Sequence, residues 1–177
     1  GLCASPSSYQ SGVLPADGWL GVAASYPGAV AIARRSTTAR VQTYAWDRDA
    51  DFRGHHARFS EEGTRFTIDG PEGEFVELLL PMTGYHNLEN ATGVYAAARS
   101  LGLPPQAIAR GFATFQGVKR RQELRGEVGG VLVIDDFAHH PTAVRETILA
   151  LRQRYPTRRL WAVFEPRSNT SRRNIHQ

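Results

Sequence analysis

The stretch that most constrains the fold runs from Val131 to Thr142 and reads VLVIDDFAHHPT. Its first four residues, Val131–Ile134, form a short continuous apolar run, which is typical of a strand buried on both faces. Pro141 suits the first turn of a following helix, where its missing N–H costs nothing. Open α/β sheets bind ligands at the carboxyl ends of their strands. Four polar residues are therefore predicted to lie at a binding or catalytic site: Asp135, Asp136, His139 and His140.

The residues after this strand predict one βαβ unit. A helix is expected from Pro141 to about Tyr155, followed by a second strand from Leu160 to Phe164. Strands joined in this way are parallel, and the crossover is right-handed. The Gly-rich residues 126–130 place a domain junction near residues 125–129, so residues 126–177 are predicted to begin a separate α/β domain.

Residues 29–125 have a different pattern, which predicts a small antiparallel β-meander followed by two helices. The expected strands are Val41–Trp46, Ala57–Phe59, Arg65–Ile68 and Phe75–Leu80, separated by Gly- and Asp-containing turns. The first helix follows Gly84 and is expected to turn Ala91, Val94, Ala98 and Leu101 inward; the second follows Pro104-Pro105 and carries Ile108, Phe112 and Phe115. Residues 29–33 are read as a short strand, and residues 1–28 as loop-like and unassigned.

The composition excludes several classes of function. The apolar runs are too short to cross a bilayer, so no membrane partner is expected. The single cysteine, Cys3, excludes an intramolecular disulfide framework and fits a cytoplasmic location. Lys119 is the only lysine, and no G-x-x-x-x-G-K-[ST] motif is present, so a P-loop that cradles phosphates is absent. The chain has no initiator Met and ends at NIHQ, which led us to expect a fragment.

The remaining polar clusters leave alternatives open. Asn87 and Asn90 share one helix face, where their amides suit the edge of an adenine or simply cap the helix. Asp135 and Asp136 suit ribose hydroxyls or a metal ion, or else cap the helix at Pro141. His139-His140 suits phosphate; without a nearby cysteine no metal site is assigned.

The basic residues are the second open case. Lys119-Arg120-Arg121 and Arg167 are candidates for binding phosphate. A nucleic-acid surface is the alternative for a chain of net charge +4, but no known nucleic-acid motif is present, so no nucleic-acid partner is predicted. His55-His56 is expected to be solvated surface.

Four segments together resemble one family. GYHNLENATGVYAAA, GVKRRQE, VIDDFAHHPTAV and FEPRSNTSRR, in this order and at these spacings, resemble the bacterial Mur ligases over about residues 34–177. Among them, DDFAHHPT followed by EPRSNTSRR is most similar to the murein tripeptide ligases, which join L-Ala-γ-D-Glu-meso-diaminopimelate to UDP-N-acetylmuramate in peptidoglycan recycling. The nearest alternative is the UDP-N-acetylmuramate–L-alanine ligases, and a non-catalytic binding module that keeps the fold is another.

The resemblance implies the end of a Mur ligase central domain, followed by the start of a Rossmann-like C-terminal domain. It implies ATP and Mg²⁺ as cofactors of the parent protein and UDP-N-acetylmuramate and the murein tripeptide as its partners, with the oligomeric state unknown. Three residues near the base, His86, Asn87 and Asn90, would bind the nucleotide, as would Arg121, Asp136 and His139. Arg167, Ser168 and Asn169 would face the peptide substrate.

The departures from the family are as informative as the matches. The P-loop, the magnesium-binding Glu and His, the carbamylated lysine and the UDP-binding domain have no counterpart in the sequence. The parent protein would activate a carboxylate as an acyl phosphate with ATP and then form an amide. No complete catalytic set is present, so this chain alone is expected to be inactive.

Overall fold

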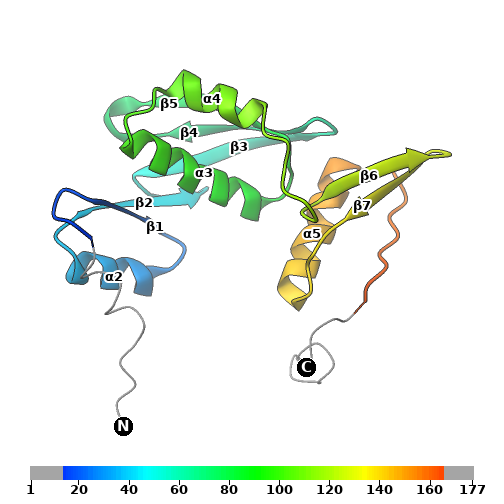
Figure 1. The fold of residues 1–177 in the computed structure, drawn as a ribbon, viewed down its shortest axis with the longest axis horizontal. Coiled ribbons are helices and arrows are strands. Elements are labelled where there is room, and N and C mark those ends of the chain that lie inside the picture. The colour runs from blue at the N-terminus through cyan, green and yellow to red at the C-terminus, as the bar shows by residue number, and fades with distance from the viewer. Residues whose placement is uncertain (1–13, 166–177) are drawn as a thin grey trace, which may run out of the picture.

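The described residues form two lobes, each built on one sheet. A five-stranded mixed sheet forms most of the first lobe (Figure 1). The computed structural model describes residues 14–165. The strands are β1 (Trp19–Ala23), β2 (Arg40–Trp46), β3 (Phe52–Ser60), β4 (Gly63–Asp69) and β5 (Phe75–Leu80), and they lie side by side in chain order. The pairs β1–β2 and β2–β3 are parallel, whereas β3–β4 and β4–β5 are antiparallel. The predicted antiparallel meander is therefore correct only for the last three strands.

The N-terminal part of the sheet corrects two predictions. Residues 29–33 belong to a helix, α2 (Pro27–Ser36), and residues 19–23 form a strand within the part read as loop. Pro27 starts the helix with its fixed φ, and the alanines and arginines that follow favour a helix over a strand. Parallel strands need a crossover connection, and α2 provides it between β1 and β2 while packing on β1 (Figure 1).

Two helices, α3 (Tyr85–Ser100) and α4 (Pro105–Ala113), cover one face of this sheet (Figure 1). They enclose the core together with β3, β4 and β5, and its fully buried large side chains include Phe66, Ile68, Leu78, Leu88 and Tyr95. The short 3₁₀ turn Pro71–Gly73 connects β4 to β5. None of the helices in residues 14–165 has the length and apolar character needed to cross a bilayer.

The buried face of α3 differs from the predicted one. Val94 is 59% exposed and Leu101 81% exposed, while Leu88, Ala91, Thr92, Tyr95 and Ala96 are buried. The spacing of apolar residues did not predict this buried face because two of its residues, Thr92 and Tyr95, carry polar groups. Thr92 satisfies its hydroxyl by donating to the carbonyl of Leu88 at 2.8 Å, and Tyr95 donates its hydroxyl to the Glu74 carboxylate. Phe115 lies beyond the end of α4 and is 37% exposed.

An ion pair ties the end of α3 to the start of β5. Arg99 donates from Nε and Nη2 to Glu74 Oε2, at 2.8 and 2.6 Å. Both side chains are largely buried, with 28% of Arg99 and 16% of Glu74 exposed. Burial opposes the ionisation of Glu74, but the hydrogen bonds from Arg99 and Tyr95 outweigh it and lower the pKa of Glu74. Burial and the bond to Glu74 raise the pKa of Tyr95.

The second lobe contains a hairpin, β6 (Glu123–Val128) and β7 (Val131–Asp135), and one helix, α5 (Pro141–Arg154). The glycine-rich residues 126–130 belong to this hairpin and its turn, with Gly129 and Gly130 at positive φ. The chain passes between the lobes at residues 114–122 (Figure 1), several residues before the predicted junction.

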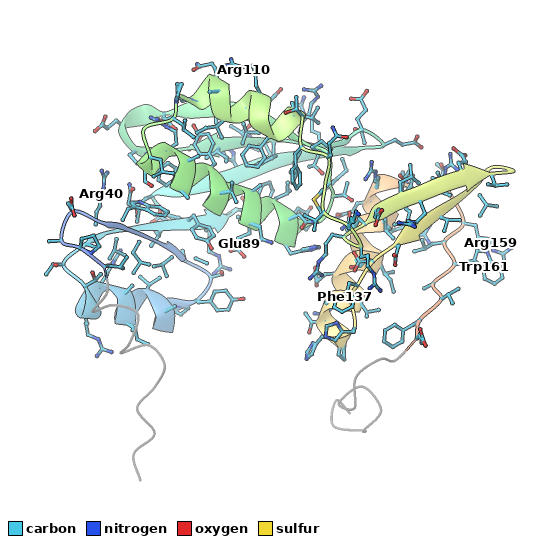
Figure 2. All side chains as sticks on the ribbon, viewed as in Figure 1. Arg40, Glu89, Arg110, Phe137, Arg159 and Trp161 are labelled. Atoms are coloured by element: carbon cyan, nitrogen blue, oxygen red, sulfur yellow. The ribbon has the colours of Figure 1, made fainter. Side chains whose placement is uncertain are left out.

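The expected parallel βαβ unit is incomplete in this lobe. Within residues 14–165, β7 pairs only with β6, antiparallel, and residues 160–164 are not a strand. Val131 and Val133 are 63% and 53% exposed, so β7 is not buried on both faces as predicted. A two-stranded hairpin buries little apolar surface, so β6 and β7 give residues 160–164 little to pack against. Figure 2 shows Arg159 and Trp161 on the outer side of this segment, where Trp161 is 76% exposed.

Candidate functional site

A cleft of about 1040 Å³ lies where the two lobes meet. It brings together five of the six residues predicted to bind a nucleotide: His86, Asn87, Asn90, Arg121 and Asp136. Three come from the first turns of α3, one from the linker and one from the loop after β7. Segments separated by up to 50 positions in the sequence thus form the walls of one site.

One wall of the cleft is apolar. It is formed by side chains of α3, α4 and the linker, among them Ala91, Val94, Ile108, Phe112, Phe115 and Val118. An apolar cleft with a few polar groups is typical of sites for small molecules and cofactors. The polar end lies against the loop after β7 and the first turns of α5, where His140, Thr142 and Glu146 also line the cleft.

The amide of Asn87 has a defined orientation. Its Nδ2 donates to the carbonyl of Thr83 at 2.7 Å, so Oδ1 is the atom left to accept from a ligand. The capping alternative is wrong, because the N-cap of α3 is Gly84 and no side chain caps the helix there. Asn90 is exposed and lines the cleft one turn further along.

The two neighbouring aspartates have different environments. Asp136 lines the cleft, and its two oxygens accept from backbone N–H groups of Gln122 at 2.9 Å and Ala138 at 2.8 Å. These bonds fix the carboxylate and leave each oxygen a further acceptor position. Asp135 does not line the cleft; its Oδ2 lies 3.6 Å from Nε of Arg120.

The predicted role of His139 in the cleft is not supported by its position. His139 does not line the cleft, and its Nδ1 lies 3.0 Å from the carbonyl of Phe137, against whose ring it packs. His140 is the histidine of this pair that reaches the cleft. Both histidines lie in the irregular segment between β7 and α5, and His139 is held at Phe137 rather than at the cleft. His55, predicted to be solvated, is buried, and its Nε2 lies 3.0 Å from Asp69 Oδ2.

The predicted substrate-binding residues Arg167, Ser168 and Asn169 lie outside the described residues. For Mg²⁺, residues 14–165 contain no group of three or more His, Cys, Asp or Glu side chains placed to hold a metal ion.

The two lobes touch at Gly84. A Cβ built there would lie 2.8 Å from Cβ of Ala150 on α5, and its φ is +101°, so only glycine permits this approach. Ala150 is buried at the contact. Further along α5, Arg154 donates to the carbonyl of Glu61, with Nη2 at 2.6 Å. The helix α5 is thus fixed against the first lobe beside the cleft.

The imidazole of His86 is half-buried at this lobe contact, and its Nδ1 is enclosed without a hydrogen-bond partner within the described part of the chain. Burial lowers the pKa of His86 below its ordinary value of 6.5. Glu146 and Asp136 raise it in part, and Arg121 lowers it further. His86 is therefore neutral at physiological pH, with Nδ1 enclosed beside Gly84.

This lowered pKa predicts a pH dependence of stability. Because the unfolded chain binds a proton at His86 more readily than the folded chain, stability is complete above about pH 6.5 and falls as the pH drops toward the folded pKa. Urea unfolding at pH 7.5 and 5.5 measures this loss of stability. The loss is expected to be smaller in His86→Gln. In the control His56→Gln, a substitution on the exposed surface of β3, it is expected to equal that of wild type. An equal loss in all three proteins would contradict the assignment.

Three site residues carried no signal in the sequence that we used. Thr83 and Gln122 are 39 positions apart and meet only through the fold. Glu146 follows Thr142 by one helical turn, and both face the cleft, so a polar stripe on the expected helix was the available signal.

Comparisons with known proteins show that the chain is similar to Mur ligases. The model of the family described as "Mur ligase, glutamate ligase domain" matches residues 120–177. These residues belong to the Mur ligase C-terminal domain family. The UDP-N-acetylmuramate–L-alanine ligase of Phenylobacterium zucineum is 37% identical over 93% of the chain, and that of Rhizobium meliloti is 41% identical over 72% of it. The chain spans about a third of the length of these curated relatives, 35% and 28% respectively.

Solved Mur ligase structures share the fold. The murein peptide ligase Mpl of Psychrobacter arcticus superposes with a TM-score of 0.62 at 31% identity, covering 96% of this chain and 35% of that protein. MurF of Acinetobacter baumannii superposes with a TM-score of 0.71 at 23% identity, over 83% of this chain and 32% of that protein. The α/β fold class and the Mur ligase resemblance are confirmed. The narrower expectation of a tripeptide ligase is not, because the curated relatives above are L-alanine ligases.

Proposed function

We propose that the chain is part of an ATP-dependent, cytoplasmic Mur ligase and forms the adenosine side of its nucleotide cleft. The observation that carries the proposal is the meeting of His86, Asn87, Asn90, Arg121 and Asp136 in one cleft with an apolar wall. Amide, carboxylate and guanidinium groups at one end of an apolar cleft match the base, ribose and phosphates of a nucleotide.

Each residue has a role that follows from its chemistry. Oδ1 of Asn87 accepts from the exocyclic amine of adenine, since Nδ2 is held by the carbonyl of Thr83. Asp136, oriented by two backbone N–H groups, accepts from a ribose hydroxyl. The exposed guanidinium of Arg121 pairs with phosphate oxygens. When bound to the whole protein, ATP activates a carboxylate for attack by an amine; this chain binds and orients the nucleotide.

The amine substrate of the parent protein is the finer part of the proposal. We infer L-alanine rather than the murein tripeptide, with UDP-N-acetylmuramate as the carboxylate substrate in both cases. The support is the set of L-alanine ligases at 37% and 41% identity. The DDFAHHPT segment resembles the tripeptide ligases, but its cleft-lining members, Asp136, Ala138, His140 and Thr142, face the proposed nucleotide and do not select the amine.

The test is nucleotide binding by the 177-residue chain. Calorimetric titration with ADP is expected to give measurable but weak binding, because the P-loop that would hold the phosphates is absent from the sequence. With UDP-N-acetylmuramate, ATP and either L-alanine or the tripeptide, no ligation is expected from this chain alone. Robust turnover by this chain alone would contradict the proposal that it only binds and orients the nucleotide.

A complementation experiment distinguishes between the two amine substrates and also tests the alternative of a non-catalytic binding module. The N-terminal part of an L-alanine ligase is supplied in trans, and ADP release is measured with each amine. Activity with L-alanine supports the proposal, whereas activity only with the tripeptide restores the tripeptide reading. A chain that binds no ADP in either setting is a binding module that keeps the fold.

A further inference from the structure

A buried side chain of the linker joins the two walls of the cleft. Gln122 is only 8% exposed, and Thr83, which precedes α3, is fully buried. Oε1 of Gln122 accepts from the hydroxyl of Thr83 at 3.0 Å, and its Nε2 donates to the carbonyl of Thr83 at 3.0 Å. The amide thus makes a two-sided bond to one residue, which fixes its position and its orientation.

The same two residues contact the proposed ligand-binding groups directly. The carbonyl of Thr83 also accepts from Nδ2 of Asn87 at 2.7 Å. The backbone N–H of Gln122 donates to Oδ2 of Asp136 at 2.9 Å. A continuous hydrogen-bonded path therefore runs from Asn87 in the first lobe to Asp136 in the second. Gln122 lines the cleft and Thr83 does not, so Thr83 acts on these two side chains only through hydrogen bonds.

The backbone of the linker is held in an unusual conformation at this point. Arg120 and Gln122 have φ of 58° and 50°, a region that costs a residue with a Cβ on the order of 1 kcal/mol. Such conformations persist when the surroundings fix them. Here the N–H of Arg120 donates to Glu123 Oε2, and the carbonyl of Arg120 accepts from the N–H of Phe137, each at 2.8 Å.

We infer that Gln122 is a positioning residue that sets how the α3 wall and the β7–α5 wall of the cleft are placed relative to one another. Its side chain anchors the linker to Thr83, and its N–H fixes Asp136 at the opposite wall. The part of the inference that concerns ligand affinity rests on the proposed nucleotide site; the part that concerns the placement of the walls does not.

The experiment compares Gln122→Met with wild type in the full 177-residue chain. Methionine keeps the length of the side chain and removes both bonds to Thr83. Hydrogen exchange followed by NMR is expected to become roughly tenfold faster at the backbone N–H groups of residues 122 and 138, because the bonds to Asp136 are no longer held in place. The N–H groups of β4 report global stability and are expected to exchange within about twofold of their wild-type rates.

Two further variants make the test specific. Gln116→Met changes an exposed glutamine of the same linker, whose Nε2 donates only to the nearby Thr114 carbonyl, and is the matched control. Gln122→Glu keeps the acceptor for the Thr83 hydroxyl and loses the donor, so an intermediate acceleration is expected. If Gln122→Met does not fold, Thr83→Val, which removes one bond and preserves shape, is compared in its place.

Affinity for ADP is the second readout. Gln122→Met is expected to weaken ADP binding roughly tenfold relative to Gln116→Met. Unchanged exchange at residues 122 and 138 would overturn the inference, as would acceleration that is equal throughout β4. If the wild-type chain binds no ADP, the proposed nucleotide function fails, and the exchange comparison still decides the role of Gln122.

Discussion

Glu74→Ala is expected to lower the free energy of unfolding of the chain by about 2–3 kcal/mol, as loss of one member of a largely buried ion pair does. The substitution leaves the fully buried Tyr95 without a partner for its hydroxyl and the Arg99 guanidinium without its carboxylate. Urea denaturation at pH 7 measures the change. A second consequence follows from the lowered pKa of Glu74: its contribution to wild-type stability is present above its ordinary value of 4.5 and is lost as the pH falls through the folded pKa.

Glu77→Ala is the matched control for this prediction. Glu77 lies on the same strand, β5, and its Oε1 is 3.9 Å from Nη1 of Arg65, with 60% of its side chain exposed. A pair of this kind contributes no more than ~0.5 kcal/mol. Equal destabilisation by the two variants would show that the buried Glu74–Arg99–Tyr95 cluster has no special role in joining α3 to β5.

Asp136→Asn is expected to weaken ADP binding by about 30-fold, or ~2 kcal/mol. The carboxylate accepts from the N–H groups of Gln122 and Ala138. An asparagine places an NH₂ group against one of these donors and also loses the charge proposed to accept from a ribose hydroxyl. Calorimetric titration of the 177-residue chain with ADP measures the effect.

The neighbouring variant Asp135→Asn is the control for Asp136→Asn. Asp135 is outside the cleft, and its nearest ionic contact is Arg120 at 3.6 Å, with both side chains more than 40% exposed. Its affinity for ADP is expected to stay within about twofold of wild type. A loss of affinity equal to that of Asp136→Asn would mean that the general negative charge of the loop matters, and not the oriented carboxylate.

The elements that sequence reasoning found best are those whose pattern is local. β5 begins and ends as predicted, at Phe75 and Leu80, because a short, mostly apolar run between turn residues has few alternatives. The starts of α3, α4 and α5 follow from Gly84, Pro105 and Pro141, because the backbone preferences of glycine and proline act at the residue itself.

Most of the wrong structural predictions concern features that depend on contacts with residues distant in the chain. The inward face of α3 was misplaced because Thr92 and Tyr95 are polar by composition and buried by virtue of bonds to Leu88 and Glu74. Residues 160–164 have the composition of a strand, but a strand requires a neighbour to pair with. The strand predicted at residues 29–33 is the exception, because Pro27 and the alanines and arginines after it favour a helix locally.

Motif order and local backbone preferences lie along the chain, so the resemblance to the Mur ligases, the starts of the helices and the side chains available to the proposed nucleotide site could be predicted from the sequence. Which of those side chains share a cleft could be seen only in the folded chain. The tertiary structure placed Asp136 and His140 in the cleft and Asp135 and His139 outside it. It also joined Thr83 to Gln122 across 39 positions. The physical reason is that side-chain direction and long-range hydrogen bonding depend on how the lobes pack, which no local pattern encodes.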